Sequence, residues 1–307
     1  MKFSPATLLF VPGIIWGVSF IVVELTLPVI PPITLTLLRT IISIIALLLL
    51  LGRAKASLPH TWQDWQPFLI LATVNQALPF SLTSWGQLYL PGGLASILLS
   101  VMPLFTVLLA LWFTEDEPLT PHKLGGIFLG LAGIIVLIGP EVLKGLGINA
   151  VAQLALVFSA FLYATGAVYT RHVYSLQPPG LSKWALRVRI MTAQFIASGI
   201  VLMPFSLLFD KPWTLRPSWD IWLYLLFLGI GVTLFATMVY FYLIEEMGAG
   251  TAATTVYLIP VAGVLAGIVV LGEQLSPSMV IALIMILLGI FIVSRGTKKQ
   301  ISVSRSR

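Results

Sequence analysis

The feature of this 307-residue sequence that most limits its fold is a series of ten apolar blocks, each about as long as a membrane-spanning helix. A spanning helix needs about 20 apolar residues, because each residue rises about 1.5 Å across a hydrocarbon core about 30 Å thick. The blocks cover residues 5–28, 32–51, 66–87, 92–113, 121–139, 149–171, 185–208, 219–244, 249–271 and 276–295. The short connections between them leave no room for a soluble catalytic domain. We therefore predict an all-α membrane protein with ten transmembrane helices.

The low content of charged residues supports this prediction. Only 9% of the residues are charged, whereas a water-soluble domain carries about 25%. The sequence contains no cysteine, so it is not a disulfide-stapled secreted domain. Met1 and Lys2 precede the first block, but its apolar stretch is too long for the core of a signal peptide and no small-x-small site ends it. We therefore expect the first block to remain as a helix.

The basic residues lie mainly on one side of the predicted bundle. With the N-terminus inside, thirteen Lys and Arg residues fall on the inner side, and only Lys144, Lys211 and Arg216 fall on the outer side. Because basic loops remain in the cytoplasm, this bias predicts that both termini are cytoplasmic. The basic tail, residues 297–307, is expected to lie beside anionic lipid head groups. We expect the lipid bilayer, and no nucleic acid, as its partner.

The two halves of the sequence repeat each other. Gly93, Ala95 and Pro103 match Gly250, Ala252 and Pro260 at a spacing of 157 residues, Glu117 and Pro121 match Glu273 and Pro277 at 156, and Trp16 matches Tyr163 at 147. Each half holds five predicted spans, so the second half enters the membrane from the opposite side. We predict two inverted five-helix repeats, residues 1–140 and 149–296, joined by an outer loop at residues 141–148.

Inverted repeats are the usual architecture of secondary transporters, which bind their solute near the middle of the bilayer between the halves. The sequence therefore favours a carrier that moves a small solute by alternating access. Pro103 and Pro260 each free a backbone carbonyl inside a predicted span, and they are the candidate hinges. A channel or lipid scramblase stays open as an alternative, because an inverted repeat can also form a pore. Nucleotide-binding loops and zinc-protease motifs are absent, so we expect no enzyme activity, metal or cofactor.

Three short motifs resemble a known family. The segment W-G-x-S-F runs from Trp16 to Phe20, Pro-Pro and then Leu-Leu-Arg open the second span, and the fourth-span proline is followed by E-x-L. These motifs resemble the drug/metabolite transporter superfamily, EamA type. The resemblance implies a ten-helix exporter of amino acids or related metabolites in the bacterial inner membrane, with a central cavity lined mainly by helices other than the fifth and tenth. Many members carry Lys where this chain has Glu24, so a site built on that lysine is not implied here.

Several properties stay open after this resemblance. Broad-range or aromatic amino-acid export is the expected activity, but drugs, purines and nucleotide sugars are alternative substrates. Transport by proton antiport and by facilitated efflux are both consistent with the sequence. We expect a monomer or a weak dimer.

Two charged residues, Glu24 and Arg39, lie well inside the predicted spans. A charge in the hydrocarbon core costs about 2.5–3.5 kcal/mol by insertion scales, so such a residue usually faces a cavity or a partner. One interpretation is an ion pair that ties the first helical hairpin. A second places Arg39 near a substrate carboxylate and makes Glu24 the carboxylate that exchanges protons. In a third, Glu24 extends to the outer interface.

Polar and aromatic residues complete the candidate substrate site. Trp16 and Tyr163 occupy equivalent mid-depth positions, where an aromatic ring can hold an ammonium group. Asn75 and Gln76 would be expensive to expose to lipid, so we expect at least one of them to face the cavity. Further candidates share helical faces with polar or aromatic neighbours: Thr170, Thr237, Tyr240 and Tyr257. Each such face can instead hold two helices together.

Overall fold

The computed structural model describes residues 5–113, 120–143, 147–247 and 253–304. Within these ranges the chain is helical, with short turns between helices and no strand. Ten helical segments follow one another, one for each predicted apolar block. Five of them are at least 18 residues long and apolar enough to cross a membrane, and four shorter apolar helices lie among the rest. The predicted all-α architecture with ten helices is therefore confirmed.

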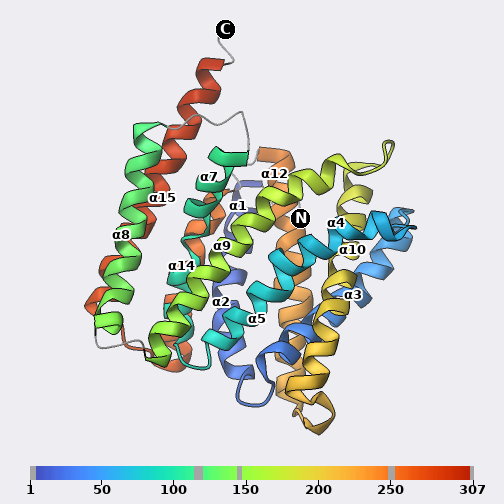
Figure 1. Cartoon of the computed structure of the whole chain (residues 1–307), viewed down its shortest axis with the longest axis horizontal. Helices are drawn as coiled ribbons and strands as arrows, with labels where there is room; N and C mark the ends of the chain where they lie inside the picture. The colour runs from blue at the N-terminus through green and yellow to red at the C-terminus, as the bar shows by residue number, and fades with distance from the viewer. Residues whose placement is uncertain (1–4, 114–119, 144–146, 248–252, 305–307) are drawn as a thin grey trace.

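Several of the ten segments contain more than one kind of helix. The first five are α1 and α2 (Pro5–Leu8 and Phe10–Thr26), α3 (Pro32–Ala54), α4 with η1 and α5 (Trp62–Ala72, Thr73–Ala77 and Leu78–Gly86), α6 and α7 (Gly92–Leu99 and Met102–Phe113), and α8 (Pro121–Leu143). The last five are α9 (Ile148–Ser175), α10 with η2 (Lys183–Phe205 and Ser206–Asp210), α11 with η4 and α12 (Trp219–Leu226, Phe227–Ala236 and Thr237–Met247), η5 with α14 and η6 (Ala253–Tyr257, Leu258–Ala266 and Gly267–Leu271), and α15 (Pro277–Ser304). Figure 1 shows α8 and α15 together at one edge of the bundle, α3, α4 and α10 at the other, and α2, α9 and α14 between them.

Two predicted connections are more helical than expected. α8 continues through Leu143, into the predicted outer loop, and α15 continues to Ser304, through most of the predicted basic tail. Residues 144–146 and 305–307, together with Glu117, lie outside the described residues. The inversion of the two halves and the cytoplasmic position of the termini stay predictions.

The outside of the bundle is apolar. Trp219, Val269 and Leu208 are each at least 70% exposed, and many other large apolar side chains lie on the surface with them. A protein in water rarely exposes contiguous apolar patches of this extent. The apolar exterior therefore matches a hydrocarbon environment.

Glycines allow several helix pairs to approach closely. A Cβ atom on Gly126 of α8 would lie 2.5 Å from the carbonyl oxygen of Gly289 on α15. On α2, a Cβ atom on Gly17 would lie 2.5 Å from the carbonyl oxygen of Ile259 on α14. Small residues at such contacts are typical of membrane helices, where packing replaces the hydrophobic effect as the force that joins helices.

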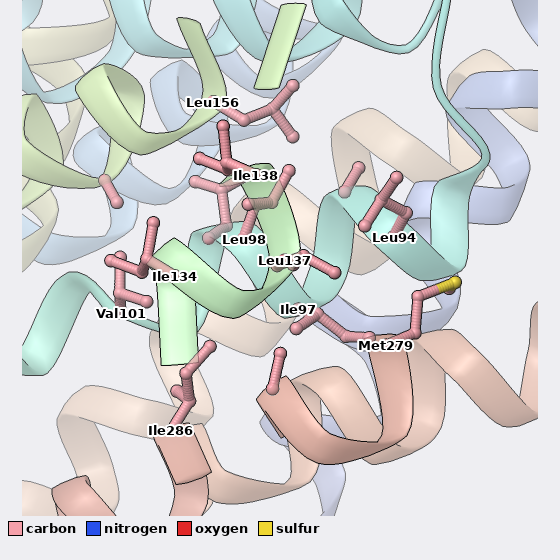
Figure 2. Packing of buried hydrophobic residues seen from close by; sticks show 14 of the residues in the cluster. Leu94, Ile97, Leu98, Val101, Ile134, Leu137, Ile138, Leu156, Met279 and Ile286 are labelled. Carbon is pink, nitrogen blue, oxygen red and sulfur yellow. The ribbon is translucent and has the colours of Figure 1, made fainter. Parts of the chain in front are cut away.

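The largest buried apolar cluster joins α6, α8, α9 and α15. It contains Leu94, Ile97, Leu98, Val101, Ile134, Leu137, Ile138, Leu156, Met279 and Ile286, which Figure 2 shows pointing toward one another. These residues come from both halves of the chain. The cluster thus holds α8 and α15, the two helices at one edge of the bundle, against the other helices.

The backbone departs from a regular α-helix at related places in the two halves. η1 in the third segment and η4 in the eighth are π-helical, and π-helical turns are frequent at functional sites. The fourth segment is interrupted at Ser100–Val101, just before Pro103, and the ninth is a 3₁₀-helix just before Pro260. The two candidate hinge prolines therefore lie beside irregular backbone, and their role as hinges stays a prediction.

Candidate functional site

Arg39 is the buried cation around which the candidate site is built. It lies on α3 with only 6% of its surface exposed. Its Nε and Nη2 atoms donate to Oγ1 of Thr233 on η4, at 3.1 and 2.8 Å. Its guanidinium carbon lies 4.3 Å from the centre of the Phe80 ring on α5. Thr233 Oγ1 in turn donates to the Leu228 carbonyl, five residues back, which is the spacing of a π-helical turn.

Within the part of the chain that the structure describes, no carboxylate forms an ion pair with Arg39. The first interpretation of these two residues, an ion pair between Glu24 and Arg39, is therefore wrong for the described residues. Arg39 contacts Thr233 and Phe80, and Glu24 accepts a hydrogen bond from the backbone N–H of Gly92 at 2.6 Å. The two side chains lie on helix faces that do not meet. Arg39 lies on the face of α3 that packs against η4 and α5, and Glu24 lies on the face of α2 that packs against α6. The guanidinium contacts the Thr233 hydroxyl and the Phe80 ring and interacts with Tyr163. Because none of these three is a carboxylate, the guanidinium retains hydrogen-bonding capacity for an anion.

Two pairs of aromatic rings lie on or against the elements that hold Arg39, and each pair joins the two halves of the chain. The Phe80 ring lies 5.6 Å from the ring of Tyr163 on α9. The Trp16 ring on α2 lies 5.3 Å from the ring of Tyr240 on α12. Trp16 also donates through Nε1 to the carbonyl of Val232, the residue before Thr233, at 3.3 Å. The structure thus brings the predicted residues Trp16, Tyr163 and Tyr240 into contact with the elements that hold Arg39.

The two predicted amides of η1 also lie between helices. Gln76 is buried, and its Nε2 atom donates to Oγ1 of Thr40, the neighbour of Arg39, at 3.1 Å. Its Oε1 atom has no hydrogen-bond partner among the described residues, and such an acceptor costs about 1–3 kcal/mol. Asn75 lies against Gly166 of α9, where a Cβ atom would come within 2.5 Å of the Asn75 side chain. Both amides therefore avoid the lipid side of their helix.

Three predicted residues have other roles or no described contact with Arg39. Tyr257 donates to the carbonyl of Ile290 on α15 at 3.0 Å and packs against the largest apolar cluster, so it joins two helices. Thr170 donates to the carbonyl of Gly166 on its own helix at 2.7 Å. Thr237 lies one turn after Thr233 and is half-buried. For Tyr257 and Thr170, the structure favours the alternative in which a polar residue serves the helices themselves.

Glu273 is a functional candidate that sequence reasoning placed only at the end of a span. It lies in the connection between η6 and α15, where it accepts hydrogen bonds from the N–H of Gly93 at 3.1 and 3.3 Å. Its carboxyl group lies beside that of Glu24, because Gly92 and Gly93, which donate to the two groups, are consecutive residues at the start of α6. Burial raises the pKa of Glu273 above its ordinary value. Its place in the repeated E-x-L pattern was the available signal, but the repeat does not indicate which side chain it meets.

Phe80, Thr233 and Thr40 are the other residues that the sequence did not assign to the site. Phe80 cannot be distinguished from ordinary packing by its sequence context, because apolar residues fill every span. Thr233 is one of the polar neighbours on the helical face that carries the predicted Thr237 and Tyr240. Their importance follows from contact with Arg39 and Gln76, which lie far from them in the sequence.

The structure has ten helices and an apolar exterior, and it buries a cation between polar and aromatic side chains of the two halves. These features are typical of multi-pass helical transport proteins. A family model described as the EamA-like transporter family matches the chain twice, over residues 4–139 and 150–295. The chain belongs to this family. The double match agrees with the repeat found between the halves.

Similar proteins from other organisms are named as transporters. An uncharacterized transporter of Archaeoglobus fulgidus is 28% identical over 91% of this chain and 95% of its own length. The uncharacterized inner membrane transporter YedA of Escherichia coli K12 is 28% identical over 94% of this chain and 90% of its own length. A probable amino-acid metabolite efflux pump of the same strain is 25% identical over 91% of each chain. The protein is therefore a multi-pass transporter of the plasma membrane.

One solved crystal structure also has this fold. It superposes with a TM-score of 0.64, covers 94% of this chain and 96% of its own, and is 21% identical in sequence. At this identity the likeness concerns the fold alone. It shows that the ten-helix arrangement occurs in an experimentally determined protein.

Proposed function

We propose that this transporter exports amino acids or closely related metabolites by alternating access between its two halves. The observation that carries the proposal is Arg39, a buried guanidinium with no ion-pair partner among the described residues. A buried charge without a partner is expensive, so it usually marks a substrate or ion pathway in a membrane protein. A substrate carboxylate would supply the missing negative charge through short, charge-assisted hydrogen bonds.

The neighbouring rings suit the rest of an amino acid. The pairs Trp16–Tyr240 and Phe80–Tyr163 provide aromatic faces close to the elements that hold Arg39. Such faces pack against apolar or aromatic side chains, and they attract an ammonium group with about 0.5–2 kcal/mol. The similarity to a probable amino-acid metabolite efflux pump supports the same substrate class.

Alternating access has structural support in the contacts between the halves. Arg39 and Trp16 lie on the first half, and both bind the π-helical segment η4 of the second half. A rocking motion of one half against the other would change these contacts first. The irregular backbone before Pro103 and Pro260 provides positions where the fourth and ninth segments can bend.

Transport by reconstituted protein tests this proposal. Liposomes that contain the protein are loaded with labelled amino acids or purines, and efflux is measured with and without a pH gradient. We expect saturable amino-acid efflux that is accelerated by the same amino acid outside, which a carrier shows and a channel does not. Efflux no faster than from empty liposomes would contradict the substrate class, and unsaturable conductance would favour a pore.

A pair of variants on one helix assigns the carboxylate to Arg39. Arg39→Lys keeps the charge but loses the planar fork of donors, so we expect weaker binding of the amino acid. Arg53→Gln changes an exposed arginine near the end of α3, and transport should stay at the parent level. Equal effects of the two variants would mean that Arg39 has no specific role.

A further inference from the structure

The start of α6 holds two carboxyl groups, one from each half of the chain. The first N–H groups of a helix have no partner within the helix, and here they donate to Glu24 and Glu273. Gly92 donates to Oε2 of Glu24 at 2.6 Å, and Gly93 donates to both carboxyl oxygens of Glu273 at 3.1 and 3.3 Å. Glu24 comes from α2, and Glu273 comes from the turn before α15. The N-terminus of α6 thus joins a first-half carboxyl group to a second-half carboxyl group.

The two carboxyl groups lie beside each other, because they accept from the N–H groups of consecutive residues, Gly92 and Gly93. An ionised carboxylate can only accept hydrogen bonds, so two ionised groups cannot form one with each other. Two carboxyl groups at such a distance share a proton, because the second negative charge is repelled by the first. Both side chains are half-buried, which reduces the screening of that repulsion by water.

No described cation neutralises the pair. Along α2, α6, α14, η6 and the part of α15 up to Val293, Glu24 is the one charged side chain whose placement is described. α11, which packs against α2, adds the exposed carboxylate of Asp220. The connection before α6 adds one titratable group, Tyr89, and the outer part of α9 adds only neutral polar residues. Glu24 and Glu273 therefore face each other with backbone N–H groups as their only described stabilising charges.

The backbone around the pair is shaped to admit it. A Cβ atom on Gly92 would lie 2.9 Å from Oε2 of Glu24, and one on Gly267 would lie 2.5 Å from Oε2 of Glu273. Gly93 leaves space for Glu273 in the same way. Gly272 has a φ angle of 67°, a left-handed conformation that suits glycine, and it reverses the chain immediately before Glu273. Larger residues at these glycines would displace one carboxyl group or the other.

A cavity adjoins this region and gives a place for water. It has a volume of about 220 Å³, and its lining includes Pro91 and Leu94, which flank the two donor glycines, and Ser276, which follows Glu273. Gln153 of α9 also lines the cavity. Gln153 is almost fully buried, and its Oε1 atom has no hydrogen-bond partner among the described residues. A buried acceptor beside a space that is large enough for several molecules points to bound water, which can accept and return a proton.

We propose that Glu24 and Glu273 hold one exchangeable proton between them, and that this proton fastens α2 to the connection before α15 on the predicted outer side. When the proton moves to water, two carboxylates remain and repel each other, and this side of the bundle opens. When water returns a proton, the hydrogen bond forms again and the side closes. The proposal rests on alternating access in the proposed function, and it assigns one of the gates to a proton.

Two measurements that need no substrate test the proposal. The chain has no cysteine, so spin labels can be placed at Leu88→Cys and Leu275→Cys, two exposed positions in the connections on either side of the pair. The distance between the labels is measured as the pH rises from about 5 to about 9. In parallel, infrared difference spectra of the protein without labels follow the carbonyl band of a protonated carboxyl group. We expect the distance to lengthen and the band to disappear with the same midpoint.

Glutamine variants identify the groups responsible. Glu24→Gln and Glu273→Gln keep the shape of the side chain, and the amide can donate to the remaining carboxylate, so each variant should remove the band and hold the short label distance at every pH. The matched control is Asp210→Asn, because Asp210 accepts from the backbone N–H of Thr34 at 2.6 Å near the start of α3. This control should keep the pH dependence of the parent.

The outcomes separate the gate from the substrate class. If the parent shows no titrating band or no change in distance, the shared proton is refuted without reference to any variant. The same conclusion follows if both glutamine variants behave like the parent. If the pH-dependent opening is present but amino acids are not transported, only the substrate assignment under the proposed function fails.

Discussion

Replacing Arg39 by methionine should abolish substrate binding with little loss of stability. The substitution removes a hydrogen bond from a charged group to Thr233, about 1.5–3 kcal/mol, and a cation–π contact with Phe80, about 0.5–2 kcal/mol. It also removes the cost of holding a charge in the membrane, about 2.5–3.5 kcal/mol. These contributions nearly cancel. We therefore expect Arg39→Met to change the free energy of unfolding by no more than about 2 kcal/mol.

The same substitution should have a large effect on binding. Truncating one partner of a buried, hydrogen-bonded charge pair costs about 2–5 kcal/mol, so the dissociation constant of a bound amino acid should rise at least about 30-fold. Thr233→Val gives the contrasting case, because it keeps the buried charge and removes its acceptor. That variant should lose about 1–3 kcal/mol of stability.

Thermal unfolding in detergent micelles, with and without added amino acid, measures both effects. Arg39→Met should unfold near the parent temperature and lose the stabilisation that the amino acid gives to the parent. Thr233→Val should unfold at a lower temperature than Arg39→Met. If Arg39→Met lost 3–5 kcal/mol, the usual cost of breaking a buried ion pair, while Thr233→Val lost nothing, Arg39 would be a structural partner and the reasoning would be refuted.

Three further predictions concern helix packing and capping. Gly126→Val should destabilise the protein by about 1–3 kcal/mol, because the new side chain meets the backbone of α15. Gly125→Val, whose Cβ atom would meet nothing within 4 Å, is the control in the same unfolding measurement. Tyr257→Phe should lose about 1 kcal/mol of unfolding free energy, because the hydrogen bond from its hydroxyl to the Ile290 carbonyl on α15 disappears; an unchanged stability would remove its assigned role. Thr61 and Asp64 form a capping box at the start of α4, and hydrogen bonds from the Thr61 side chain and backbone lower the pKa of Asp64. The cap therefore stabilises α4 fully above the unfolded pKa of about 3.9, and this stabilisation is lost as the pH falls through the lower folded pKa. Amide exchange at the start of α4 should therefore accelerate in acid, and in Thr61→Ala it should be fast at every pH.

The sequence was most informative about helix formation, because each helix depends mainly on the residues of its own block. A membrane helix satisfies its own backbone hydrogen bonds, so the length and apolarity of each block were sufficient to predict ten helices. Proline and glycine marked the ends: Pro32, Pro121 and Pro277 begin helices, and Gly272 ends one with a left-handed turn. The scarcity of charge well inside the predicted spans likewise selected Glu24 and Arg39 for attention.

The substrate site stays a prediction, but the structure shows how its predicted residues pack. Trp16, Tyr163, Tyr240 and Gln76 lie in the network of contacts around the elements that hold Arg39. Tyr257 shares the same sequence signal but bonds to another helix instead. A polar or aromatic residue on a helical face gives the same pattern in both cases, because the pattern does not say which neighbour that face meets.

The sequence by itself determined that the chain forms ten apolar helical segments and repeats itself, since these properties depend on local apolarity and spacing. Only the tertiary structure decided that Arg39 meets Thr233, 194 residues away, and that Gly93 meets Glu273, 180 residues away. The physical reason is that the rotation and approach of packed helices depend on the fit of many small side chains at once. For this reason Glu24, which is one helix away from Arg39, lies beside Glu273 of the other half of the protein instead.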